Sequence, residues 1–261
     1  MRCTMLLLGL AAAMAGCVTD GADSRDDGDD GDGDDGKSDG ATTMAGSYAL
    51  ELLSNMKLED DRKSGDARFS QFSLRARALV TARQTGKDVA LSIKLCDAKL
   101  PMVDGFQPAL DPALIPAIPA VALTGVLADG RLSTESAAIV LGAALSDPIG
   151  EALPTTDTDA RLRDQDRDDK PGVTIAISVG RIFAALRVRF ALDAPVSSTS
   201  TIAGAADLHL DQAILGDTIP FFDAAASAAE SNGHIRVVSS ANTFRMKSNA
   251  ATCAEVSLAL P

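Results

Sequence analysis

The sequence predicts an all-β protein, an antiparallel β-barrel or β-sandwich with one short helix and a proline-rich loop. Apolar residues alternate with polar ones in many short segments, and a period of two is typical of strands with one buried face. Turn residues separate these segments, and one alanine-rich segment combines helix formers with helix-boundary signals. The predicted domain, residues 46–261, is long enough for a single sizeable core.

The alternation predicts where the strands lie. It is clearest in residues 72–80, 89–95, 173–179 and 182–192. In the last of these, Arg181, Arg187 and Arg189 are expected on the solvated face. Further strands are predicted at residues 47–53, 121–127, 134–141, 201–210, 235–239, 243–247 and 253–260.

Two segments depart from the strand pattern. Residues 220–233 are rich in alanine, begin with a proline and end in Asn-Gly, which predicts a helix. Residues 106–123 contain Pro108, Pro112, Pro116 and Pro119, a spacing that argues against a regular helix or a central strand. The apolar content of this proline-rich segment predicts a loop that packs on the domain, either as hydrophobic cover or as a lid over a cavity.

The N-terminus predicts export. Residues 1–16 combine Arg2 with an apolar run that is shorter than the roughly 20 residues of a membrane-spanning helix, as in a signal peptide. Residues 14–17, Met-Ala-Gly-Cys, resemble the lipobox of bacterial lipoproteins, which implies lipidation of Cys17 and a membrane anchor. Val18 replaces the Asp that favours inner-membrane retention in enterobacteria, so we expect an outer-membrane or cell-surface location. An ordinary signal peptide and a periplasmic or secreted protein is the alternative.

Residues 17–45 are expected to form a disordered tether after the lipidated cysteine. Between Asp20 and Asp39 the chain has ten Asp against Arg25 and Lys37, and no large apolar side chain. Such a segment cannot bury enough surface to offset its ordering entropy. It also lacks the fixed period of calcium-binding Asp-Gly repeats. A tether that holds the domain away from a membrane is therefore the preferred interpretation.

The remaining composition excludes some partners. Residues 41–261 carry 21 basic and 26 acidic residues, and the chain has no Trp and one Tyr. A weakly acidic domain with few aromatic residues offers neither a basic surface for phosphates nor stacking platforms for bases, so nucleic-acid binding is not expected.

Cys96 and Cys253 remain once Cys3 is assigned to the signal peptide and Cys17 to the lipid anchor. In an oxidising compartment they are expected to form a disulfide. A metal site is the alternative, but neither cysteine has a neighbouring His or Cys at ligand spacing.

Residues 54–57, SNMK, match Ser-x-x-Lys but lack the partner motifs Ser-Asp-Asn and Lys-Thr-Gly, and the other catalytic motifs searched are absent, so no enzymatic activity is expected. His209 lies two residues from Asp207 and from Asp211, so a regular strand would place all three on one face. This face could present a metal or an acid–base pair, but a solvated polar face explains the same residues and is preferred.

Residues 164–172, DQDRDDKPG, offer a candidate cation site. Asp164, Asp166 and Asp168 have the spacing of the first three ligands of an EF-hand, so they could bind calcium. The sixth position is Asp169 instead of Gly, and the twelfth is Ile175 instead of Glu, so the segment is not an EF-hand. A charged solvent loop of Asp and Arg pairs is the alternative.

The same segment resembles one found in uncharacterised predicted lipoproteins of myxobacteria, Asp-x-Asp-Gly-Asp-Gly-x-Pro-Gly-Val-Thr before a β-strand. The matching residues are Asp164, Asp166, Asp168, Pro171, Gly172, Val173 and Thr174. The late Cys253 and the acidic tether are also similar. Arg167 and Asp169 replace the two glycines, and their side chains are expected to disfavour a tight calcium turn. The resemblance implies no known function.

Two functions remain open. The domain could hold an apolar small molecule or a lipid, as the mouths of β-barrels often do. Alternatively, it is a structural or interaction protein of the cell envelope with a filled core and no ligand.

Overall fold

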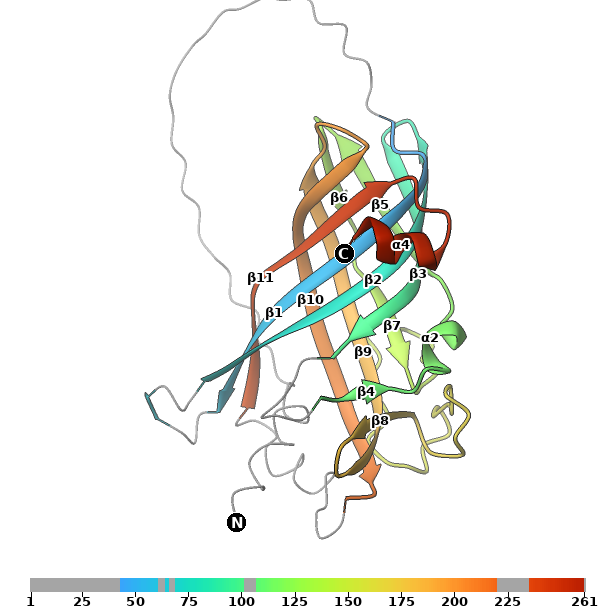
Figure 1. Cartoon of the computed structure of the whole chain (residues 1–261), viewed down its shortest axis with the longest axis vertical. Helices are drawn as coiled ribbons and strands as arrows, with labels where there is room; N and C mark the ends of the chain where they lie inside the picture. The colour runs from blue at the N-terminus through green and yellow to red at the C-terminus, as the bar shows by residue number, and fades with distance from the viewer. Residues whose placement is uncertain (1–42, 61–63, 66–68, 101–106, 220–234, 261) are drawn as a thin grey trace, which may run out of the picture.

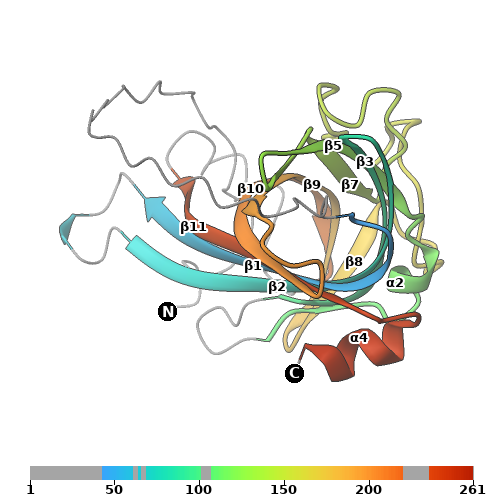
Figure 2. The ribbon, with the colours of Figure 1, turned by 90° about the horizontal axis from the view of Figure 1, so that it is seen from above.

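A computed structural model describes residues 43–60, 64–65, 69–100, 107–219 and 235–260, and within these ranges the chain forms a closed antiparallel β-barrel (Figures 1 and 2). The signal peptide, Cys17 and nearly all of the tether lie outside the described residues, as does the helix predicted at 220–233. The eight barrel strands, in chain order, are β1 (Gly46–Asp60), β2 (Phe69–Thr85), β3 (Asp88–Lys99), β5 (Val121–Ala128), β6 (Arg131–Thr134), β9 (Gly180–Pro195), β10 (Thr201–Asp217) and β11 (Ile235–Ser248).

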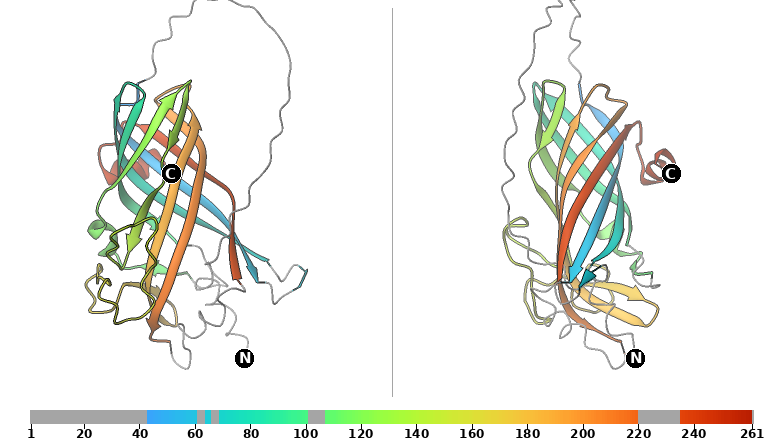
Figure 3. Two further views of the ribbon diagram at one scale, coloured as in Figure 1. Left: turned by 180° about the vertical axis from the view of Figure 1, so that it is seen from behind. Right: turned by 90° about the vertical axis from the view of Figure 1, so that its left-hand side faces the viewer.

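Neighbouring strands pair in the order β10-β11-β1-β2-β3-β5-β6-β9, and β9 pairs with β10 to close the ring. The prediction of an antiparallel all-β domain is confirmed, and of its two forms the chain adopts the barrel. The two strands predicted at residues 235–239 and 243–247 are parts of the single strand β11. At one end β1, β2 and β11 extend away from the ring as a ribbon (Figure 3).

The second edge of β9 pairs with three strands in succession. β6 pairs with the last residues of β9, β7 (Ala137–Leu141) pairs with its middle, and β8 (Val173–Ile177) pairs with its first residues. A short strand, β4 (Ala109–Leu110), pairs with β8. The strand predicted at residues 134–141 is confirmed from Ala137 to Leu141 as β7, but its start is wrong, because Thr134 is the last residue of β6.

The alternating apolar residues point into the barrel. The largest group of buried residues combines inward positions of all eight barrel strands with Ala137 of β7, and Leu50, Val80, Leu132 and Met246 are completely buried in it. Each such side chain contributes roughly 1.5–3 kcal/mol through burial. Apolar side chains therefore fill the part of the barrel that lies towards β5 and β6.

The connection from β7 to β8, residues 142–172, covers the outer surface of β9 and β10. Leu153 and Ala143 of this connection pack against Phe183, Ala185 and Leu215. The expectation that Arg187 is solvated is therefore wrong, because this layer leaves it only 8% exposed. Its guanidinium lies 2.6 Å from the Asp211 carboxylate and donates to the backbone carbonyl of Glu151.

The C-terminal segment is a helix, α4 (Cys253–Ala259), and not the strand predicted at residues 253–260. Thr252 accepts a hydrogen bond from the backbone N–H of Glu255, whose side chain accepts from the Thr252 N–H; this capping box satisfies the first free N–H groups of the helix. Val256 and Leu260 then pack onto Ala49 on the outer face of β1.

The predicted disulfide is confirmed. Cys96 on the outer face of β3 is bonded to Cys253 at the start of α4, with Cα atoms 5.2 Å apart and a sequence separation of 157. The bond fixes the C-terminal helix to the barrel wall.

The proline-rich segment packs on the barrel, as expected. It contains β4 and the one-turn helix α2 (Leu114–Ala117), in which Pro116 is tolerated because first-turn N–H groups need no helical partner. Leu114 and Ile118 are buried among residues of β3, β7, β8 and β9. Lys94 donates to the backbone carbonyls of Pro116 and Ile118, which fixes the segment to β3.

Candidate functional site

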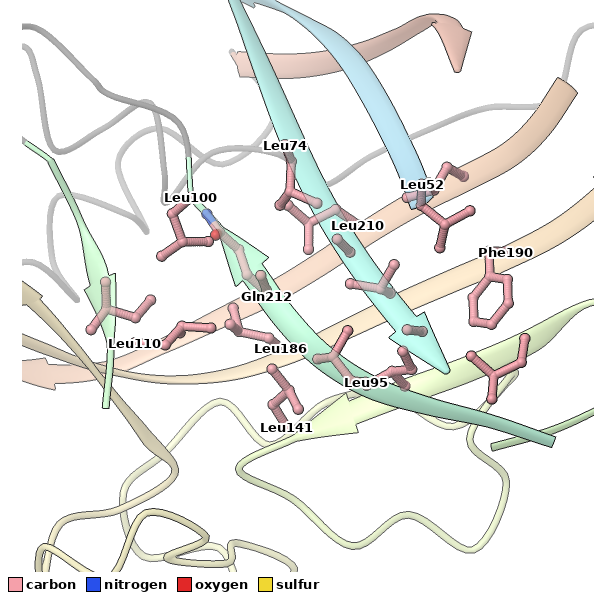
Figure 4. A pocket seen from close by; sticks show the side chains of 18 residues that line it. Leu52, Leu74, Leu95, Leu100, Leu110, Leu141, Leu186, Phe190, Leu210 and Gln212 are labelled. Atoms are coloured by element: carbon pink, nitrogen blue, oxygen red, sulfur yellow. The ribbon is translucent and has the colours of Figure 1, made fainter. Parts of the chain in front are cut away.

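The barrel contains an apolar cavity of about 100 Å³. Its lining comes from eight of the strands and from Leu100, and its side chains converge from opposite walls (Figure 4). The lining residues are Leu52, Leu74, Ala76, Ala78, Ile93, Leu95, Ala98, Leu100, Leu110, Ile139, Leu141, Ile175, Leu186, Val188, Phe190, Leu208, Leu210 and Gln212. Gln212 is the single polar side chain among them, so the cavity favours an apolar occupant.

One wall of the cavity is closed by side chains and not by strand pairing. β3 pairs with β5 only from Asp88 to Ile93, and on this side the described residues include no strand partner for Leu95–Lys99. The proline-rich segment lies over this part of β3, where Leu114 and Ile118 pack against Leu95. The barrel ladder is thus interrupted at the place where the proline-rich segment covers the cavity.

Small side chains explain why space remains there. Ala76, Ala78 and Ala98 all line the cavity, and their side chains are smaller than the Leu, Ile and Phe side chains that make up most of the remaining lining. The sequence pattern identified the inward face of residues 72–80 but not this cavity, because alternation reports which way a side chain points and not how much space it fills. The small inward residues Ala76, Ala78 and Ala98 were the one feature of the sequence that pointed to unfilled space in the interior.

The structure shows the contacts of the three residues that were considered for a polar site around His209. His209 Nε2 lies 3.2 Å from Asp207 Oδ1, and both side chains are mostly exposed. Asp211 is instead paired with Arg187 and Arg189. Asp207 and His209 thus contact each other, whereas Asp211 belongs to a separate group with two arginines.

The three aspartates predicted to bind calcium do lie together. One carboxylate oxygen from each of Asp164, Asp166 and Asp168 lies within 4.8 Å of the other two. Asp164 accepts hydrogen bonds from the backbone N–H groups of Asp168 and Asp169, at 3.1 and 3.0 Å. These bonds fold the segment so that three like charges meet.

Asp166 is the buried member of this cluster. Its side chain is 4% exposed, and its Oδ2 accepts from the Thr174 N–H at 2.6 Å. Burial raises the pKa of this carboxyl, and the neighbouring charge of Asp168 adds to the effect. Partial burial also acts to raise the pKa of Asp164, but its backbone N–H donors outweigh that effect and lower the pKa. The cluster thus holds a carboxylate where the fold disfavours its charge.

Arg167 and Asp169, which replace glycines in the similar lipoproteins, both have a φ of 62°. The expectation that side chains would disfavour the tight turn is therefore wrong for the backbone conformation. Such left-handed conformations cost non-glycine residues of order 1 kcal/mol each, and the hydrogen bonds to Asp164 offset that cost.

A second group of charges stabilises the same connection. Arg161 donates to Asp159 Oδ2 at 2.7 Å and to Glu151 Oε1 at 2.8 Å. These hydrogen bonds lower the pKa of Asp159 to about 2 and also lower that of Glu151. Arg161 therefore links the two ends of residues 151–161.

Replacing Arg161 by Gln is expected to raise the pKa of Asp159 from about 2 towards its ordinary value of 3.8. Because the folded-state pKa lies below the unfolded value, the ion pair stabilises the fold above pH 3.8, and this stabilisation is lost as the pH falls towards 2. Carboxyl-detected NMR titration measures the shift. Arg163→Gln is the matched control, since the Arg163 guanidinium donates to the backbone carbonyls of Ala160 and Leu162 and forms no ion pair with a described residue. An Asp159 pKa that stays near 2 in Arg161→Gln would contradict the assignment.

In the described part of the chain, no helix is both long and apolar enough to cross a bilayer. No protein-family model, no curated protein and no solved structure matches the chain, so the cavity and the aspartate cluster carry the functional argument on their own geometry.

Proposed function

We propose that the domain binds a single apolar chain or small apolar molecule inside the barrel, and that it does so as a lipid-anchored protein of the cell envelope without enzymatic activity. The observation that supports this proposal most is the apolar cavity beside the proline-rich segment. A well-packed interior contains few voids larger than a water molecule. An apolar cavity of about 100 Å³ lowers stability unless something fills it.

The size of the cavity limits the occupant. An engineered apolar cavity of about 150 Å³ holds benzene, whereas pockets for drug-sized ligands measure roughly 300–1,000 Å³. A cavity of about 100 Å³ therefore suits the terminal part of one hydrocarbon chain and not a whole lipid. A polar headgroup would remain outside, because the lining offers one polar side chain, Gln212.

The proline-rich segment is the proposed entrance. Leu110 of β4 lines the cavity, and β4 is held by pairing two residues with β8. Moving this segment breaks few backbone hydrogen bonds, because the adjacent part of β3 has no described strand partner on that side. The lid interpretation is thus preferred to simple hydrophobic cover.

The alternative function is a structural or interaction protein of the envelope with no ligand. The filled part of the barrel, where Leu50, Val80, Leu132 and Met246 are fully buried, favours it. The two functions differ in whether occupation of the cavity stabilises the fold.

Thermal unfolding with and without 1-decanol, a single uncharged hydrocarbon chain, tests the proposal. At about one hundred times its dissociation constant a ligand stabilises by roughly 2.7 kcal/mol, which raises Tm by about 5 °C or more for a domain of this size. Ala78→Leu is expected to abolish this rise because the larger side chain occupies the cavity.

Ala122→Leu is the matched control, because it adds the same atoms to an exposed residue of β5. It should retain the full response to decanol. An equal rise of Tm in Ala78→Leu would show that decanol binds elsewhere, and no rise in any variant would favour the ligand-free alternative.

A further inference from the structure

The connection that leads into β8 contains a buried carboxylate oxygen that lacks a hydrogen-bond donor. Asp166 is 4% exposed, and its Oδ1 receives no hydrogen bond from the described residues, while its Oδ2 accepts from the Thr174 N–H. Buried polar atoms are almost always paired, and an uncompensated buried charge is strongly unfavourable. A bound cation is one physical way to remove this cost.

The surroundings of Asp166 provide the other ligands. Carboxylate oxygens of Asp164, Asp166 and Asp168 lie within 4.8 Å of one another, close enough to contact one ion. The nearest described cation, Arg181, lies 3.9 Å from Asp168 Oδ2 and is more than half exposed. An arginine at that position leaves the buried oxygen of Asp166 uncompensated.

We propose that Asp164, Asp166 and Asp168 bind a calcium ion. Three carboxylates with no nitrogen or sulfur ligand select a hard cation, and calcium accepts irregular sets of six to eight oxygens better than magnesium does. The carboxylate oxygens that already accept backbone N–H groups retain further lone pairs, so these hydrogen bonds are compatible with the ion. Water and backbone carbonyls complete such sets in proteins.

The ion would stabilise the first residues of β8. Thr174 donates its N–H to Asp166 and its hydroxyl to Asp168, at 2.6 and 2.7 Å, so two of the proposed ligands hold one residue of the strand. The next residue, Ile175, lines the cavity. The calcium site would thus stiffen one wall of the cavity without contacting its contents.

Thermal unfolding of the full-length protein in EDTA and in millimolar calcium chloride tests the proposal. Calcium is expected to raise Tm by about 5 °C or more at saturation. Asp166→Asn should remove this rise and leave Tm in EDTA equal to or above that of the unchanged protein, because the amide has nearly the same shape and no charge. If Asp166→Asn remains folded in EDTA, its missing calcium response reflects loss of the ion site and not loss of the fold.

Asp157→Asn is the matched control, since Asp157 is exposed in the same connection and the substitution removes the same charge. Residues 20–39 contain ten aspartates in every variant, so any effect of calcium binding there is the same in all of them and does not alter the difference between their Tm responses. The assignment is overturned if calcium leaves Tm of the unchanged protein at its EDTA value, or if Asp166→Asn responds as Asp157→Asn does. An equal response to magnesium would overturn the choice of calcium.

Discussion

Removing the Cys96–Cys253 disulfide is expected to lower the free energy of unfolding by about 3–5 kcal/mol. The bond closes a loop of 157 residues, and a crosslink over so long a loop removes much of the conformational entropy of the unfolded chain. It also holds α4, whose Val256 is completely buried against the barrel together with Leu260. Chemical denaturation of the double variant Cys96→Ala, Cys253→Ala measures the loss.

The unchanged protein in reducing agent provides the matched comparison. It should show the same loss, whereas the double variant should not respond to the reducing agent. A double variant within about 1 kcal/mol of the oxidised protein would show that the packing of α4, and not the crosslink, stabilises this end of the chain.

Replacing Phe190 by Ala is expected to destabilise the domain by about 3–5 kcal/mol. Phe190 on β9 is 1% exposed and forms part of the boundary between the filled interior and the cavity. Deleting its ring would enlarge a cavity that already exists, so the cost lies at the upper end for such substitutions. Denaturant unfolding measures the free energy.

Phe190→Leu controls for the change in side-chain type, because it retains most of the volume and should cost less than half as much. Benzene should partly restore the stability of Phe190→Ala by filling the enlarged space. A cost below about 1 kcal/mol for Phe190→Ala would show that the interior collapses around the truncated side chain and that the walls of the cavity are not rigid.

The strands of the barrel were predictable because their apolar residues repeat every second position. Val89, Leu91 and Ile93 lie inside, as the pattern requires. Errors arose where a second layer covers the outer face: Phe183, Ala185 and Arg187 are buried although they alternate with the inward residues. Alternation cannot report a layer that is added by a distant segment.

The C-terminal helix was missed although its signal was present. Thr252 and Glu255 have the spacing of a capping box, but the alternating Val256, Leu258 and Leu260 also fit a strand. Leu258 is 81% exposed, so part of this apparent alternation packs against nothing in the described chain. The capping residues predicted the helix better than the alternating apolar residues predicted a strand, because a capping box acts within one turn and does not depend on distant packing.

The two candidate sites differed in how far they could be predicted. The aspartate cluster is local, and its spacing placed Asp164, Asp166 and Asp168 together without knowledge of the fold. The burial of Asp166 arises in the folded connection between β7 and β8 and could not be inferred from the spacing. The cavity gathers residues from eight strands, so no local pattern could reveal it.

Mass spectrometry of lipids that co-purify with residues 41–261 tests the proposed apolar binding most directly. This part of the chain contains all described strands and lacks Cys17, so lipid that co-purifies with it is not attached through the proposed anchor. If the barrel binds a hydrocarbon chain, organic extraction should release about one acyl-chain molecule per protein, and Ala78→Leu should release much less. Lipid well below stoichiometric amounts, equal in both proteins, would contradict the proposal.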